Sequence, residues 1–305
     1  MCGRYASARK RIELLDEFSV QRDTVTEDLA PDYNVAPTKP VYAVLTRAQS
    51  PAADGEPATD AVAADGNGAV ERGAGRRATG EADPDSAGAS GHAERELRVV
   101  RWGLVPFWAK DVKIGSRMIN ARAETVAEKP AFRRAFAKRR CLLPADGYYE
   151  WQQQPGTAKQ PIYISRRDGR SLAFAGLYEL WRDGTVARDD PEAWLWTATV
   201  ITTSAPDELG MIHDRMPMII DPGSWTDWLD PANNDVADLR SLLTPAAVSG
   251  LITYPVSTEV NSVRNNGPRL IEPVGPAPAA PLAAAGTGAP ASAADRGDDS
   301  TGALF

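Results

Sequence analysis

Cysteine at the second position is the residue of this sequence that most directly suggests chemistry. The chain opens Met-Cys-Gly-Arg-Tyr, and Cys141 is the only other cysteine. A small residue after the initiator methionine normally lets that methionine be removed, which leaves Cys2 with an α-amine and a thiol. Their unperturbed pKa values, about 8 and about 8.5, leave part of each group nucleophilic at neutral pH. Such a 1,2-aminothiol reacts with aldehydes: the amine forms a Schiff base, and the thiol then closes a thiazolidine ring. A cysteine near the start of a chain is equally compatible with no chemistry.

Two further residues suggest proton transfer. His213, in Met-Ile-His-Asp-Arg-Met-Pro, is the only histidine besides His92. It is either a structural hydrogen-bonding residue or, because imidazole titrates near neutral pH, a proton donor. Glu150 lies among aromatic residues in Gly-Tyr-Tyr-Glu-Trp. It is either a solvent-facing residue of an edge strand or a partly buried carboxyl whose pKa is raised toward the range useful for acid–base chemistry.

Two other segments suggest contacts with nucleic acid. In the segment 118–125, Asn120 could orient a substrate by hydrogen bonds and Arg122 could hold a phosphate bidentately. The same segment is also typical of a helix start or a surface ion pair. In the segment 101–108, aromatic residues that include Trp108 lie close to Arg101, an arrangement suited to stacked bases beside a phosphate backbone. Those aromatic residues are equally suited to a hydrophobic core.

Composition divides the chain of 305 residues into a core and two appendages. Residues 48–96 are mostly Ala, Gly, Asp, Glu, Pro, Ser and Thr, and residues 276–305 are similar. Because such segments cannot bury enough apolar surface to offset their ordering entropy, both are predicted to be disordered. The remainder is expected to form one domain over 1–275, interrupted by the insert 48–96. The formal net charge is −7, of which the ten acidic and four basic residues of 48–96 contribute −6. The acidic balance therefore describes the appendages, and a near-neutral core is still compatible with a basic groove.

Hydrophobic periodicity predicts the elements that would position these residues. Helices are expected at 7–18, with Ser7 as the N-cap, and near 130–138, 222–229 and 235–243. Strands are expected at 41–46, 97–105, 141–143, 148–151, 161–165, 172–181, 194–203 and 252–256. The insert would then be the long loop of a hairpin. Strands outnumber helices without regular βα alternation, which predicts an α+β fold: a mostly antiparallel mixed sheet or open β-barrel-like core with short peripheral helices.

Signals for other classes of protein are missing from the sequence. Two distant cysteines predict neither a disulfide framework nor a zinc site, and no cofactor is expected. No signal peptide is recognisable, and no stretch approaches the length of a membrane span. We therefore expect a soluble cytoplasmic protein, a monomer with no membrane partner.

Seven motifs, in order around Cys2, resemble the SOS response-associated peptidase (SRAP) family of abasic-site processing proteins. They are Met-Cys-Gly-Arg-Tyr at 1–5, Tyr-Asn-Val-Ala-Pro-Thr at 33–38, Trp-Gly-Leu-Val-Pro-Phe-Trp at 102–108, Asn-Ala-Arg-Ala-Glu-Thr at 120–125, Cys-Leu-Leu-Pro-Ala-Asp-Gly-Tyr-Tyr-Glu-Trp at 141–151, His-Asp-Arg-Met-Pro at 213–217 and Val-Ser-Thr-Glu-Val-Asn at 256–261. They span the core, and the insert 48–96 interrupts none of them.

The resemblance implies that Cys2, freed of Met1, captures the aldehyde of an abasic site in single-stranded DNA as a thiazolidine crosslink. It implies that Glu150 is the acid–base group, that His213 protonates the sugar ring oxygen, and that Asn120 orients Cys2. It also implies a set of DNA-binding residues: Arg4, Arg122 and Arg215 at phosphates that flank the lesion, Trp108 stacked on the neighbouring bases, and Asn34 as a support of the N-terminal strand. An (auto)peptidase that removes Met1, an abasic-site lyase, and association with the nucleoid on DNA are further implications.

Two alternatives remain open from the residues themselves. The first is an N-terminal-nucleophile thiol hydrolase that acts on small amides or peptides. The second is a noncovalent binding module for single-stranded nucleic acid, in which Cys2 plays no part. Turnover of a peptide without any aldehyde would indicate the former. Salt-sensitive binding that is equal for intact and abasic strands would indicate the latter.

Overall fold

A computed structural model describes residues 2–48, 93–153, 156, 158–187, 189–244 and 250–275 of the chain. The predicted disordered tail 276–305 lies outside the described residues, and so do Met1, His92 and most of the predicted insert. The predicted boundaries of the insert are too wide, because Ala48 and residues 93–96 are described and belong to strands. These residues pair directly across the hairpin, so tertiary pairing extends the strands into the polar segment.

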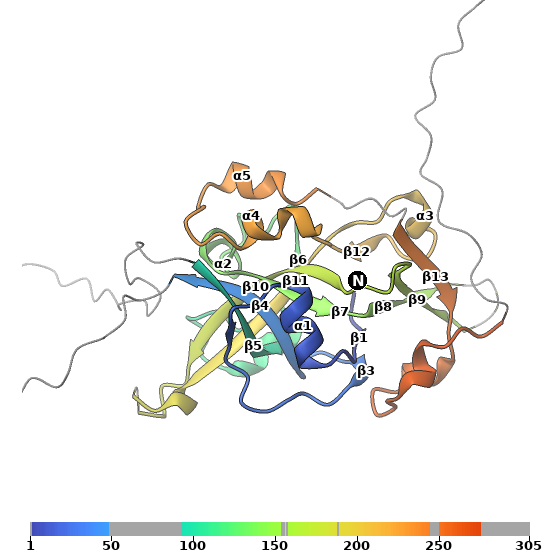
Figure 1. The fold of residues 1–305 in the computed structure, drawn as a ribbon, viewed down its shortest axis with the longest axis horizontal. Helices are drawn as coiled ribbons and strands as arrows, with labels where there is room; N and C mark the ends of the chain where they lie inside the picture. The colour runs from blue at the N-terminus through green and yellow to red at the C-terminus, as the bar shows by residue number, and fades with distance from the viewer. Residues whose placement is uncertain are drawn as a thin grey trace, which may run out of the picture.

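Five strands form a closed barrel at the centre of the molecule (Figure 1). They are β4 (Pro40–Ala48), β5 (Ala93–Trp102), β7 (Arg140–Ala145), β10 (Leu172–Arg182) and β11 (Trp194–Ser204). Neighbours pair antiparallel around the ring except β11 and β5, whose parallel pairing closes it. The predicted α+β class and mostly antiparallel pairing are confirmed, and the barrel closes rather than remaining open.

Short strands along β5 and β11 extend the barrel. The strand β2 (Arg22–Asp23) pairs with β5, while β6 (Asn120–Arg122) and β12 (Arg215–Pro217) pair with β11. The segment 120–122 is therefore a strand and does not start a helix. Because β11 binds both β6 and β12, it brings Asn120 and the residues that follow His213 to one strand.

A second, antiparallel sheet carries the amino terminus. Its order is β13 (Leu251–Pro255), β9 (Gln160–Arg166), β8 (Gly147–Gln152), β1 (Tyr5–Ser7) and β3 (Asp32–Val35). Strand β1 lies between β3 and β8, where Tyr5 is opposite both Val35 and Tyr148. The first residues of the chain are thus held in the interior of a sheet, next to the strand that contains Glu150.

Short helices surround the two sheets, as predicted. The α-helices are α1 (Arg11–Glu17), α2 (Arg133–Lys138), α3 (Asp207–Gly210), α4 (Trp225–Leu229) and α5 (Val236–Ser241). The 3₁₀ helices are η1 (Val112–Arg117), η2 (Pro191–Ala193), η3 (Pro222–Ser224), η5 (Thr258–Asn261) and η6 (Pro268–Ile271). The prediction that Ser7 caps the first helix is wrong. Ser7 ends β1, and Lys10 precedes the helix, because pairing with β3 and β8 extends the backbone there.

Alternation along the barrel strands divides the hydrophobic core in two. On β4, Val41, Ala43 and Leu45 pack in one cluster, and Tyr42 and Val44 pack in the other. This is the period of two expected for a strand that is buried on both faces. The first cluster also contains Cys2, Tyr5 and Tyr148, so it joins the barrel to the second sheet and packs against the first residues of the chain.

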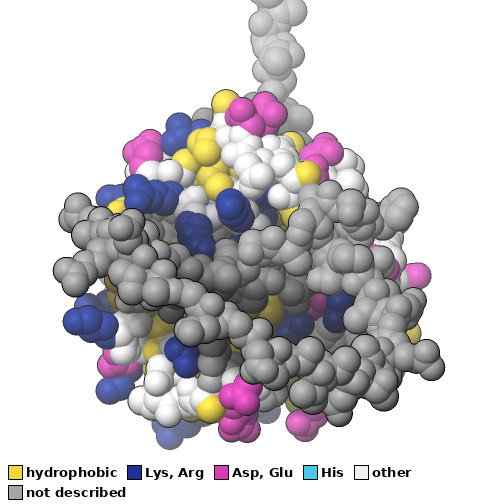
Figure 2. All heavy atoms as spheres, turned by 90° about the vertical axis from the view of Figure 1, so that its left-hand side faces the viewer, with side chains coloured by type: hydrophobic (Ala, Val, Ile, Leu, Met, Phe, Trp, Pro, Cys, Tyr) yellow, Lys and Arg dark blue, Asp and Glu magenta, His cyan; other side chains and the backbone are white. Residues whose placement is uncertain are grey.

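Basic side chains are visible on the surface of the described core. Figure 2 shows lysine and arginine side chains on the left-hand side of the molecule as drawn in Figure 1, interspersed with acidic, apolar and polar groups. The described core therefore carries positively charged surface although the whole chain has a formal net charge of −7.

Candidate active site around Cys2

Cys2 is fully buried and lies three residues before the start of β1. The backbone beyond it is fixed by β8, where the Tyr149 N–H donates to the Arg4 carbonyl. From the barrel side, Asn120 Nδ2 donates a 2.8 Å hydrogen bond to the Cys2 carbonyl. Residue 2 is therefore held from both sheets, and the predicted proximity of Asn120 to Cys2 is present in the structure.

Burial raises the pKa of the Cys2 thiol well above its ordinary value, and the nearby charge of Glu150 raises it further. The amino terminus and the Arg4 N–H act in the opposite direction but do not compensate. The thiol is thus protonated at neutral pH, and a thiolate is disfavoured in this environment. Any electrophile that arrives here meets a neutral S–H group rather than a preformed thiolate.

Glu150 lies on β8, with 3% of its surface exposed. Burial raises the pKa of its carboxyl from the ordinary 4.5 to about 7, against the lowering effect of the positive amino terminus. The carboxyl is then about half ionised at neutral pH, so it can both accept and donate a proton. Its low exposure makes Glu150 the buried carboxyl of the two alternatives and not a solvent-facing one, and the neighbouring Tyr148 and Tyr149 are fully buried as well.

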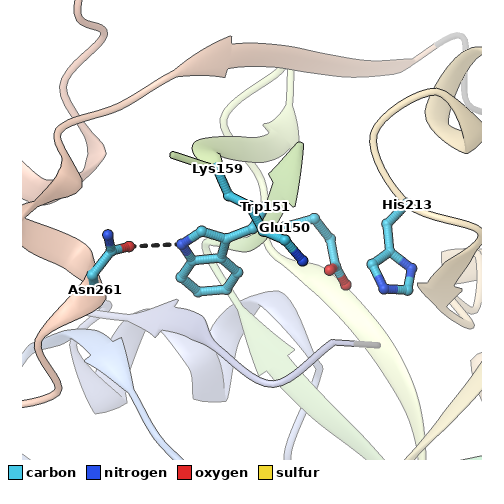
Figure 3. Close-up of a pocket in the computed structure, with 5 residues that line it drawn as sticks. All are labelled: Glu150, Trp151, Lys159, His213 and Asn261. Atoms are coloured by element: carbon cyan, nitrogen blue, oxygen red, sulfur yellow. Dashed lines mark hydrogen bonds between the residues drawn. The ribbon is translucent and has the colours of Figure 1, made fainter. Parts of the chain in front are cut away.

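His213 lies in the turn between α3 and β12, and its imidazole faces the Glu150 carboxylate (Figure 3). Its Nδ1 accepts a 3.0 Å hydrogen bond from the Arg215 N–H and lies 2.7 Å from Asp214 Oδ1. Desolvation lowers the pKa of His213, with a further contribution from the positive amino terminus.

Glu150 and His213 line one surface pocket of about 480 Å³ together with Trp151, Lys159 and Asn261 (Figure 3). Trp151 Nε1 donates a 2.7 Å hydrogen bond to Asn261 Oδ1, which links β8 to η5. None of these three residues was predicted from the sequence to belong to a site. Trp151 and Asn261 end two of the seven motifs, so a signal existed for them, whereas Lys159 lies in none.

Arg4 and Asn34 are engaged inside the protein. Arg4 Nη1 donates to Asn34 Oδ1 at 2.7 Å and to the Val260 carbonyl at 2.8 Å, and its guanidinium lies 5.7 Å from the Trp151 ring centroid. Asn34 is fully buried, and its Nδ2 faces three backbone carbonyls, those of Val260, Ser262 and Asn265. Asn34 therefore has no exposed surface with which to contact DNA, and the pair instead anchors the segment around η5.

The other predicted DNA-binding residues differ in how accessible they are. Arg215 forms an ion pair with Glu124 at 2.5 Å and donates to the Thr202 carbonyl at 2.6 Å, so its guanidinium is already engaged. Arg122 is exposed, and Trp108 is 49% exposed. Neither of these two lines the pocket. The structure thus brings Cys2, Asn120, Glu150 and His213 together and leaves Arg122 and Trp108 on the surface.

Two further features bear on the kind of protein this is. Within the described ranges, no group of three or more His, Cys, Asp and Glu side chains is arranged to hold a metal ion. No described helix is long and apolar enough to cross a membrane.

Comparison with known proteins gives a family and a fold. The model of the SOS response associated peptidase (SRAP) family matches residues 1–263. The abasic site processing protein YoqW of Bacillus subtilis is 35% identical over 272 residues, which cover 89% of this chain and 99% of YoqW. The abasic site processing protein HMCES of Gallus gallus is 34% identical over 205 residues, 60% of this chain and 59% of HMCES. A crystal structure of a Bacteroides thetaiotaomicron protein, 24% identical, matches with a TM-score of 0.64 over 90% of this chain and 100% of its own, which shows the shared fold.

Proposed function

Because the chain belongs to the SOS response-associated peptidase family, we propose that it processes abasic sites in single-stranded DNA by covalent capture on Cys2. The relatives YoqW and HMCES are both named abasic site processing proteins, which supports the abasic-site role. The observation that carries the covalent step is the placement of Glu150, a buried carboxyl with a pKa of about 7, against a thiol that stays protonated.

The reaction begins once Met1 has been removed. His213 donates a proton to the ring oxygen of the abasic sugar as the hemiacetal opens to the aldehyde, and it takes up the proton that the anomeric hydroxyl releases, so the imidazole returns to its starting state. The neutral α-amine of Cys2 then adds to the aldehyde carbon, and the resulting carbinolamine loses water with a proton from the Glu150 carboxyl. This gives an iminium ion and leaves Glu150 as a carboxylate.

Ring closure follows from the same groups. The Cys2 sulfur adds to the iminium carbon while its proton passes to the Glu150 carboxylate, and the product is a thiazolidine. Net loss is one water, and Glu150 returns to its starting state. The raised pKa of the thiol fits this order, because the amine rather than the sulfur is the first nucleophile. Asn120 holds the Cys2 carbonyl throughout and so keeps the amine and thiol directed at one carbon.

The thiol hydrolase alternative requires a different first step. It needs a thiolate, or a base that generates one before the substrate reacts, and burial opposes the thiolate here. The placement of the thiol therefore favours aldehyde capture over attack on an amide.

A denaturing gel with synthetic oligonucleotides tests the proposal. Wild-type protein lacking Met1 is expected to form a denaturant-resistant complex with an abasic single strand and none with the intact strand. Cys2→Ala should form none with either. Cys141→Ala is the matched control, because it removes the other buried free thiol and should leave crosslinking intact. A complex that persists in Cys2→Ala would refute capture through the thiazolidine.

A further inference from the structure

The lining of the pocket contains one lysine and no arginine. A DNA strand that places its abasic sugar beside Glu150 brings phosphates close to a partly ionised carboxyl, and such phosphates need positive charge to bind. Arg4 and Arg215 lie nearby, but their guanidinium groups already bind Asn34, Val260, Glu124 and Thr202. Neither arginine lines the pocket, so a cation that meets a phosphate at the pocket surface must come from another residue.

Lys159 is the lysine that lines this pocket. It immediately precedes β9, whose first residue, Gln160, pairs with Gln152 of β8, so its backbone lies alongside the end of the strand that carries Glu150. Figure 3 shows its side chain passing Trp151 with the ammonium group directed toward the Glu150 side of the pocket. Lys159 is exposed. Its charge is therefore accessible from solvent at the mouth of the pocket.

We propose that Lys159 is a positioning residue of this site, whose ammonium binds the DNA phosphate next to the abasic sugar. The inference rests on the proposed function, which supplies the DNA strand, and it adds a residue that no motif indicated. Lysine suits the role because its compact ammonium binds a phosphate as a point charge and needs no fixed planar geometry.

The same charge acts on His213. Desolvation, the positive amino terminus and Lys159 lower the pKa of this imidazole, while Asp214 raises it, and the Glu150 carboxyl faces it across the pocket. A phosphate bound to Lys159 offsets the positive charge of its ammonium. The affinity of His213 for a proton then rises when DNA binds, so the imidazole gains the proton that it gives to the sugar ring oxygen.

The test compares Lys159→Gln with Lys159→Arg, and uses Lys138→Gln, an exposed lysine on α2 outside the pocket lining, as the matched control. Noncovalent binding of an intact single-stranded oligonucleotide is measured in the Cys2→Ala background over a range of salt concentrations. Lys159→Gln is expected to weaken binding severalfold and to reduce the slope of log K against log salt by about 0.7, the value for one phosphate contact on a single strand. Lys159→Arg should retain most of the affinity and most of the salt slope. Lys138→Gln should have the affinity and slope of the Cys2→Ala parent.

A second measurement follows the rate of crosslinking to an abasic strand against pH at subsaturating DNA. Loss of the cation raises the pKa of His213 in the free protein. In Lys159→Gln the alkaline limb of the pH–rate profile, where the rate falls, should therefore shift to higher pH. Lys159→Arg should leave that limb in place. Unchanged binding, salt slope and pH profile in Lys159→Gln would overturn the proposal. If Lys159→Arg is as impaired as Lys159→Gln, the amine itself takes part in the chemistry, and the positioning role is wrong.

The two proposals fail separately. The binding measurement uses an intact strand and a protein without the Cys2 thiol, so it does not depend on covalent capture. Absence of crosslinking in wild type would refute the proposed function. The salt dependence of binding would still show whether Lys159 contacts a phosphate.

Discussion

Substitution of Glu150 by Gln is expected to raise the stability of the fold at alkaline pH and to slow crosslinking. The carboxyl is buried, and burial is the largest cause of its raised pKa. Below pH 4.5 the carboxyl is protonated in both the folded and the unfolded chain, so it does not lower the free energy of unfolding. As the pH rises toward 7, the unfolded chain loses this proton and the folded chain retains it, so stability falls. Above pH 7 the folded protein carries the full cost of a buried charge.

The magnitude follows from the pKa. A rise from 4.5 to about 7 corresponds to about 3 kcal/mol of unfolding free energy. Glutamine keeps the shape of the side chain without its charge, so Glu150→Gln should be more stable than wild type at pH 8 by up to about 3 kcal/mol. For a domain of this size that is a rise in Tm of about 6–12 °C. At pH 5 most of the difference should disappear. Crosslinking should fall by about two to four orders of magnitude at both pH values, because the acid–base group is lost.

Thermal unfolding of both proteins at pH 5 and pH 8, with crosslinking rates measured at the same two pH values, provides the assay. A gain in Tm that is equal at the two pH values would show that the carboxyl is not the source of the pH dependence. A variant that crosslinks at the wild-type rate would remove Glu150 from the mechanism altogether.

Three other substitutions test separate parts of the structure. Asn120→Ala removes the hydrogen bond to the Cys2 carbonyl and should slow crosslinking about tenfold to a hundredfold, with DNA affinity unchanged in a binding assay. Asn34→Ala leaves the carbonyls of the segment around η5 without their donor and should cost about 2–4 kcal/mol in urea unfolding, with faster hydrogen exchange at 258–266. Tyr148→Phe removes a buried hydroxyl that has no hydrogen-bond partner among the described residues. The unfolding free energy of this variant should therefore equal or exceed that of wild type. A decrease of more than about 1 kcal/mol in urea unfolding would show that the hydroxyl has a partner.

Long periodic strands of this fold are readable from the sequence. The predicted strands 172–181 and 194–203 match β10 (Leu172–Arg182) and β11 (Trp194–Ser204) within a residue, because their apolar runs are buried on the barrel. The short strands β1, β3, β6 and β12 are not predicted by periodicity. Each has three or four residues, and only pairing with distant strands defines it, as when Tyr5 meets Val35 and Tyr148.

The site shows the same division between local and distant information. The aromatic residues around Glu150 suggest its burial, which is a local property of the strand. The contact of Asn120 with Cys2 across 118 residues is implied only by family resemblance, since neither residue type nor spacing specifies it. The engagement of Arg4 by Asn34 and of Arg215 by Glu124 also joins distant positions. Exposed arginines and arginines that are engaged within the protein look alike in the sequence until the fold is known.

The intact mass of the complex formed with an abasic single-stranded oligonucleotide tests covalent capture most directly. We expect a species whose mass equals the chain without Met1 plus the oligonucleotide minus one water, stable in denaturant without a reducing agent. Cys2→Ala retains an α-amine and can form the imine, so it should give a covalent adduct only when borohydride reduces that imine. An unreduced adduct of Cys2→Ala, or a wild-type adduct that retains Met1, would contradict the claim that the amine and the thiol of Cys2 close one ring on the abasic sugar.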